Sequence, residues 1–140
     1  MKPIMVAVDG SEPSLKGLRV AAELSRATSA PLLLVHVVSP VALPVPLSPE
    51  IAERLEAGER AHADFVVSRS LSEATSLEAK ADGLVIHGGP AEALSDTADS
   101  RDCSMVVIGS RGRGGVARVL LGSVADRLVH ICKKPVLVVK

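Results

Sequence analysis

The sequence predicts an α/β fold, in which helices cover both faces of an open, mostly parallel sheet. Short runs rich in Val, Leu and Ile alternate with longer segments of helical spacing, which is the pattern of successive β–α–β units. The runs are almost continuously apolar, as strands covered on both faces are. A chain of 140 residues has the usual size of one domain, so a single domain over residues 1–140 is expected. The five predicted strands are Ile4–Val8, Leu32–Val38, Leu84–His87, Met105–Ile108 and Val136–Val139.

Segments of helical spacing between these runs predict four helices. Pro13 lies in a first turn, where proline is tolerated, and Ser48 precedes Pro49 as an N-cap. Ser123 begins a capping-box-like sequence and is expected to start the last helix. The four helices are expected over Pro13 to about Ala27, Ser48 to about Ser72, a short segment opening at Gly88, and Ser123 to just before Lys133.

Composition and charge exclude several classes of partner. Sixteen basic residues balance sixteen acidic ones, so the chain lacks the charge of a general nucleic-acid or anionic-membrane binder. Phe65 is the single residue among Phe, Tyr and Trp, so no stacking platform for single strands can be built. No apolar run reaches the length of a membrane span, and the first one is too short for a signal peptide. We expect no nucleic-acid partner and no membrane insertion.

The cysteines and histidines indicate a reducing compartment and no metal centre. Cys103 and Cys132 show neither metal-ligand nor CxxC spacing, which favours a cytoplasmic location over a disulfide framework. His62 and His130 fall on predicted helices without a metal-ligand partner at i+4. His36 lies inside the second predicted strand and is interpreted as structural.

The most informative segment is glycine-rich and runs from Gly109 to Ser123, directly after a strand and before a helix. Glycines let the backbone approach a phosphate closely, and a helix N-terminus offers unpaired N–H groups and a favourable dipole. The segment is not a Walker A loop, because Gly115 stands where that motif needs lysine. It therefore predicts an anion site of another kind.

The spacing resembles that of the ATP-binding universal stress proteins: a glycine, two residues, a glycine, nine residues, then Gly-Ser. Here these positions are Gly109, Gly112, Gly122 and Ser123. Residues 6–11 are similar to the family's first strand and turn, and residues 134–139 to its last strand. The segment 39–80 matches only in general character.

The resemblance implies a Rossmann-like, five-stranded parallel sheet in the order 3-2-1-4-5, with the nucleotide across the carboxyl ends of strands 1 and 4. A physical rule agrees independently, because open α/β sheets bind ligands where the strand order reverses. The two strands that flank this point end near Asp9 and Gly109.

Carried over residue by residue, the resemblance assigns some residues to the ribose and base of the nucleotide and others to its phosphates. Asp9, in the turn with Gly10 and Ser11, would contact the ribose or help to hold a divalent ion, although an aspartate here also suits a helix cap. The backbone of Val38 would bind adenine, although an apolar strand end is also ordinary core.

At the phosphate end, Gly109, Gly112 and Gly122 would leave room for the backbone to approach the ligand. The Ser123 hydroxyl and the Val124 amide would hold phosphate oxygens. Two arginines are expected either to clamp phosphates or to be simply solvated: Arg111 and Arg113.

Together with these residues, the resemblance implies a stress-response module that binds ATP, or ADP or AMP, with Mg²⁺ and hydrolyses ATP slowly at most. No positioned base or GxSxG elbow accompanies the loop, so binding outranks efficient catalysis. The alternatives are a slow ATPase or self-phosphorylating enzyme of the same fold, and a dimerisation module that binds no nucleotide. A homodimer through the Val136–Val139 edge strand is also expected, because this strand is apolar and carries no charge or proline within it.

Overall fold

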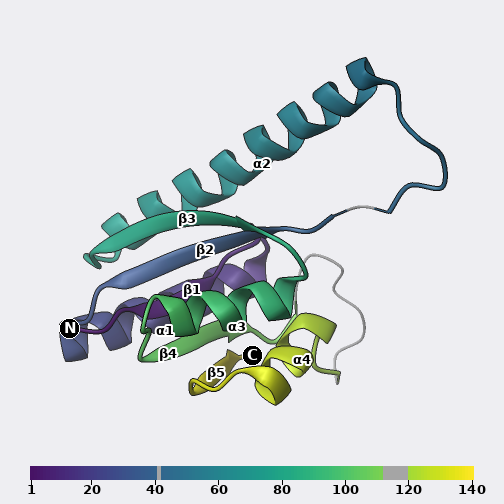
Figure 1. Ribbon diagram of the computed structural model, residues 1–140. Coiled ribbons are helices and arrows are strands. Elements are labelled where there is room, and N and C mark those ends of the chain that lie inside the picture. Colours follow the sequence, from purple (N-terminus) through teal and green to yellow (C-terminus); the bar gives the residue numbers. More distant parts are fainter. Residues whose placement is uncertain (41, 112–119) are drawn as a thin grey trace.

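Five parallel strands alternate with four helices in the computed structural model, which describes residues 1–40, 42–111 and 120–140 (Figure 1). The strands lie in the order β3-β2-β1-β4-β5, which confirms the predicted topology. The elements are β1 (Ile4–Ala7), α1 (Glu12–Thr28), β2 (Leu32–Val38), α2 (Pro49–Ser76), β3 (Ala81–His87), α3 (Pro90–Ser100), β4 (Met105–Gly109), α4 (Ser123–Ile131) and β5 (Val136–Val139).

The strand order reverses at β1, which pairs on one side with β2 and on the other with β4. Ile4 is in register with Leu32 in β2 and with Met105 in β4. The chain therefore leaves β1 and β4 in opposite directions across the sheet. The carboxyl ends of these two strands form the switch point where this class of sheet binds ligands.

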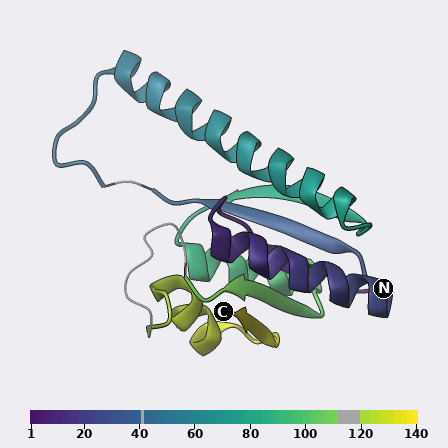
Figure 2. The ribbon, with the colours of Figure 1, turned by 180° about the vertical axis from the view of Figure 1, so that it is seen from behind.

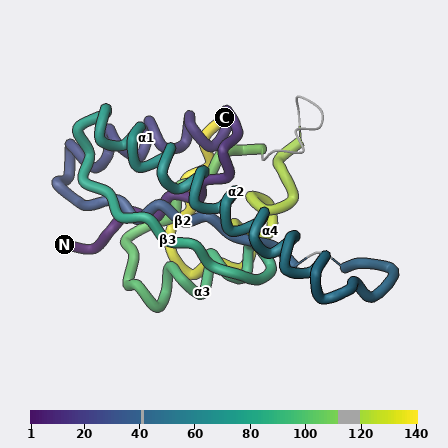
Figure 3. The backbone as a smooth tube through the Cα atoms, turned by 90° about the horizontal axis from the view of Figure 1, so that it is seen from above, coloured from purple at the N-terminus to yellow at the C-terminus, as the bar shows by residue number. Residues whose placement is uncertain are grey.

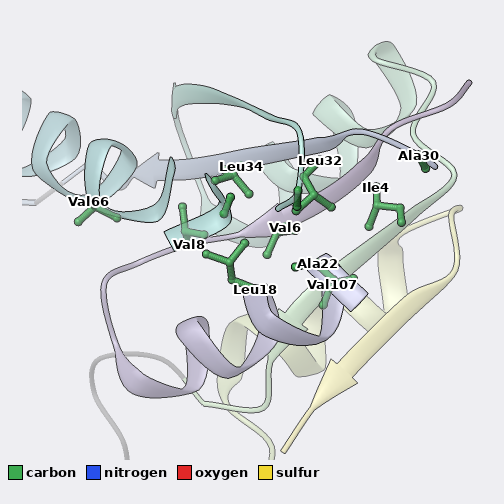
Figure 4. Packing of buried hydrophobic residues seen from close by; sticks show 13 residues of the cluster. Ile4, Val6, Val8, Leu18, Ala22, Ala30, Leu32, Leu34, Val66 and Val107 are labelled. Carbon is green, nitrogen blue, oxygen red and sulfur yellow. The ribbon is translucent and has the colours of Figure 1, made fainter. Parts of the chain in front are cut away.

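Alternate strand residues supply two hydrophobic layers, one on each face of the sheet. In β1, Ile4 and Val6 pack with α1 and α2, whereas Met5 packs with α3 and α4. Figure 4 shows the first layer, in which Leu18 of α1 and Val66 of α2 converge on the strands. Figure 3 shows α1 and α3 on opposite sides of the strands, so helices cover both faces as predicted.

Two element boundaries differ from the sequence prediction by more than two residues. β3 begins at Ala81 rather than at Leu84, because it pairs with β2 from the Leu32–Ala81 register onward. The polar Asp82 and the small Gly83 are tolerated at this edge and hide the strand in the sequence. α2 ends at Ser76 rather than near Ser72, because its last turns still pack on the sheet through the buried Ala74.

Helix α2 is longer than the sheet that it covers. Its buried side chains all lie in the second half, from Ala63 onward. The first half projects past the carboxyl ends of the strands, as Figures 1 and 2 show. The middle of α2 therefore passes the rim of the switch point.

Candidate functional site

A cavity of about 660 Å³ opens at the carboxyl ends of β1, β2 and β4. The start of α4 closes one side, and the middle of α2 closes another. Most of the predicted site residues line this cavity, namely Asp9, Val38, Gly109, Arg111, Gly122, Ser123 and Val124. Gly112 and Arg113 lie outside the described residues.

The turn between β1 and α1 is organised by the carboxylate of Asp9. Its Oδ1 accepts hydrogen bonds from the Ser11 amide at 2.9 Å and from the Ser11 hydroxyl at 2.5 Å. Ser11, and not Asp9, is the N-cap of α1, because its Oγ accepts from the Ser14 amide at 3.3 Å. Gly10 has φ +83°, a conformation that few other residues adopt. Gly10 and Ser11 thus shape the turn, and Asp9 alone of the three lines the cavity.

The start of α4 differs from the capping box that the sequence suggested. Gly122 is the N-cap, and Ser123 is the first residue of the helix. The amide of Gly122 donates a hydrogen bond to the carbonyl of Ser110, the residue directly after β4, at 2.6 Å. Among the described residues, no side chain caps α4. The first-turn N–H groups of Ser123 and Val124 therefore remain for an anion at the cavity wall.

The fold itself requires glycine at position 109, independently of ligand binding. A Cβ atom built there would lie 2.6 Å from the carbonyl oxygen of Pro13 in the first turn of α1. Real Cβ atoms essentially never approach a backbone atom so closely. The end of β4 and the start of α1 thus pack backbone against backbone directly beneath the cavity.

The opposite end of the cavity contains two histidines whose position the sequence interpretation missed. His36 of β2 is 7% exposed, and its Nδ1 lies 2.8 Å from the carbonyl oxygen of Val8. The His62 ring of α2 meets it edge to face, with 5.8 Å between ring centroids. Both rings line the cavity, as does Glu59. His36 is structural, as predicted, but it also faces the site.

The Val38 carbonyl, predicted to face the base, already accepts a hydrogen bond from the Gly88 amide at 3.1 Å. A carbonyl oxygen has two lone pairs, so one remains for a ligand. His87, the last residue of β3, is exposed and is not among the residues that line the cavity.

The described residues also bear on metal binding and on membrane insertion. Within residues 1–40, 42–111 and 120–140, no three His, Cys, Asp or Glu side chains are grouped to hold a metal ion. In the same part of the chain, no helix combines the length and the apolar character needed to cross a membrane.

Comparison with known proteins decides the family. The family model described as the universal stress protein family matches residues 1–140. The chain belongs to the universal stress protein family. A universal stress protein of Thermus aquaticus is 32% identical, over 99% of this chain and 98% of its own length. One from Mycolicibacterium smegmatis is 36% identical over 97% of this chain, which spans only 47% of that relative.

A solved universal stress protein resembles the whole chain in three dimensions. It comes from Archaeoglobus fulgidus, was determined in complex with dAMP, and is 26% identical with a TM-score of 0.73. The match covers 100% of this chain and 98% of that protein. This universal stress protein therefore shares its fold with a relative that holds an adenine nucleotide.

Proposed function

We propose that the protein binds ATP, or ADP or AMP, with Mg²⁺ in the switch-point cavity and acts as a nucleotide-dependent module of the stress response. The observation that carries this proposal is the start of α4 at the cavity wall, which no side chain of the described residues caps. The amides of Ser123 and Val124 and the Ser123 hydroxyl supply the donors that a phosphate chain needs. The dAMP bound to the Archaeoglobus fulgidus relative supports the same class of ligand.

The cavity suits a nucleotide in size and in the arrangement of its polar groups. Its volume of about 660 Å³ falls within the usual range of small-molecule sites. The phosphates would lie at α4, and the base would lie toward Val38 and α2. Asp9 would hold the ribose or the Mg²⁺ between them, since Mg²⁺ is usually bound by one or two carboxylates together with phosphate oxygens.

The proposed activity is binding with slow turnover at most. The two histidines that line the cavity lie on β2 and α2, at the end opposite the expected phosphates. The Oδ1 atom of Asp9 already accepts two hydrogen bonds from Ser11, so this oxygen is occupied within the turn. We place the protein in the cytoplasm, the compartment that its two free cysteines favour.

We expect titration calorimetry to give one Mg-ATP per chain, and turnover well below the typical enzyme rate of about 10 per second. Magnesium-free buffer and a pyrimidine triphosphate serve as controls. Absence of heat with ATP at millimolar concentrations would contradict the binding proposal. Enzyme-like phosphate release would instead make the protein an ATPase.

We also propose a homodimer through β5, an edge strand that pairs with β4 alone among the residues that the structure describes. The carbonyls of Pro135 and Val139 accept hydrogen bonds from the amides of Val106 in β4 and of Ser110 directly after it, so alternate residues of β5 face inward. The N–H and C=O groups of Val138 therefore point outward, to the free edge. Antiparallel pairing about a two-fold axis would satisfy them and bury the half-exposed valines.

Val138→Pro should halve the particle mass in light scattering, because it removes an outward N–H and leaves the β4 ladder intact. Val138→Ala keeps the N–H group and should retain the wild-type mass. The interface is wrong if the proline variant assembles like the wild type, or if the wild type is monomeric throughout the micromolar range.

A further inference from the structure

In the part of the chain that the structure describes, His36 is a buried residue of the cavity whose second ring nitrogen makes no hydrogen bond. Its Nδ1 atom lies 2.8 Å from the Val8 carbonyl oxygen, which can only accept. The ring proton must therefore sit on Nδ1. In the neutral ring, Nε2 then carries a lone pair and is an acceptor.

The Val8–His36 hydrogen bond fixes the ring as well as its tautomer. The Val8 amide donates to the Val35 carbonyl at 2.9 Å. Val8 is therefore bonded to β2 through its amide as well as through its carbonyl. The His62 ring meets His36 edge to face and limits its rotation from the side of α2. His36 thus presents Nε2 in one orientation without help from a ligand.

The Nε2 atom reaches the cavity surface. Among the described residues, every enclosed side-chain nitrogen or oxygen has a hydrogen-bond partner. The hydrogen bond of His36 in this part of the chain is made by Nδ1. Since Nε2 has no such partner, it cannot be fully enclosed. His36 is only 7% exposed and lines the cavity, so the exposed surface of Nε2 faces the cavity.

We infer that Nε2 of His36 accepts a hydrogen bond from the exocyclic amine of the purine and thereby selects 6-amino over 6-oxo purines. This inference rests on the proposed nucleotide site. An adenine amine donates to the lone pair, whereas the 6-oxo group of inosine or guanine presents a second lone pair and repels it. His36 is two residues before Val38 on the same strand and both residues line the cavity, so both acceptors lie at the expected base end.

The test compares ATP with inosine triphosphate (ITP), whose purine also differs at N1 but not in its sugar or phosphates. Calorimetry on the wild type should give at least about tenfold tighter binding of ATP, since an unmet acceptor at a polar site is costly. His36→Leu removes the acceptor and should bring the two affinities to within about threefold. ATP binding should fall, whereas ITP binding should stay the same or improve.

His36→Asn is a second variant in case His36→Leu does not fold. The asparagine amide can still donate toward the Val8 carbonyl, but no atom replaces Nε2. His87→Leu, at an exposed histidine that does not line the cavity, is the matched control and should keep the wild-type ATP-to-ITP ratio. A wild type that binds both nucleotides equally, or His36 variants that keep the wild-type ratio, would overturn the role of His36 and leave nucleotide binding intact. A wild type that binds neither nucleotide would overturn both proposals.

Discussion

Ser123→Asp should weaken ATP binding about 100-fold, which corresponds to about 2.7 kcal/mol. Ser123 is the exposed first residue of α4, beside the amides that we assign to the phosphates. A carboxylate there would occupy the anion position and repel the phosphate chain. It would not harm the fold, because an acidic residue in a first turn complements the helix dipole.

Two controls distinguish this local repulsion from a loss of stability and from a change in net charge. Thermal unfolding of the nucleotide-free variant should occur at or above the wild-type temperature. Ser68→Asp, on the exposed face of α2, makes the same change in net charge and should leave the ATP affinity unaltered. If Ser123→Asp binds ATP as tightly as the wild type does, the phosphates do not lie at α4.

Gly109→Ala should lower the free energy of unfolding by about 3 kcal/mol, at the upper end of the cost of overpacking. The new methyl group would meet the Pro13 carbonyl oxygen at 2.6 Å, and neither backbone can move without displacing β4 or α1. Urea unfolding of the nucleotide-free protein measures this loss. The ATP affinity should also fall, because the β4 end carries the cavity floor.

Gly17→Ala is the control on the other side of the same contact. Its new methyl group would lie 3.5 Å from the Gly109 amide nitrogen, an ordinary van der Waals distance. Alanine is favoured over glycine inside a helix by up to about 1 kcal/mol, so this variant should be as stable as the wild type or more stable. Equal stability of the Gly109→Ala variant and the wild type would show that the two backbones separate easily.

The sequence predicted the sheet and its switch point well because strands buried on both faces leave a simple apolar signature. The edge strand β3 was predicted too short, since Asp82 and Gly83 interrupt its apolar run. The resemblance in glycine spacing then placed Asp9 and Ser123 at one cavity, which the strand pattern alone does not require.

The remaining features depend on packing that no local pattern encodes. His62 and Glu59 line the cavity because α2 passes the end of β2. The buried residues in the second half of α2 determine this position of the helix. The N-cap of α4 was assigned to Ser123 because serine is a common cap. The backbone bond between Gly122 and Ser110 decides the position instead.

The hydrogen bond between His36 and Val8 supplies this protein with a native spectroscopic reporter. The chain contains neither Trp nor Tyr, so ordinary intrinsic fluorescence cannot follow ligand binding. Because His36 is buried and its Nδ1 proton is held by the Val8 carbonyl, we expect this proton to exchange slowly enough to appear in nitrogen-15 correlation spectra. A ligand at Nε2 changes the shift of that nitrogen, and the Nδ1–H signal monitors the end of β1 in the same titration. Occupancy and the response of the sheet can thus be followed at one side chain without any label that alters the site.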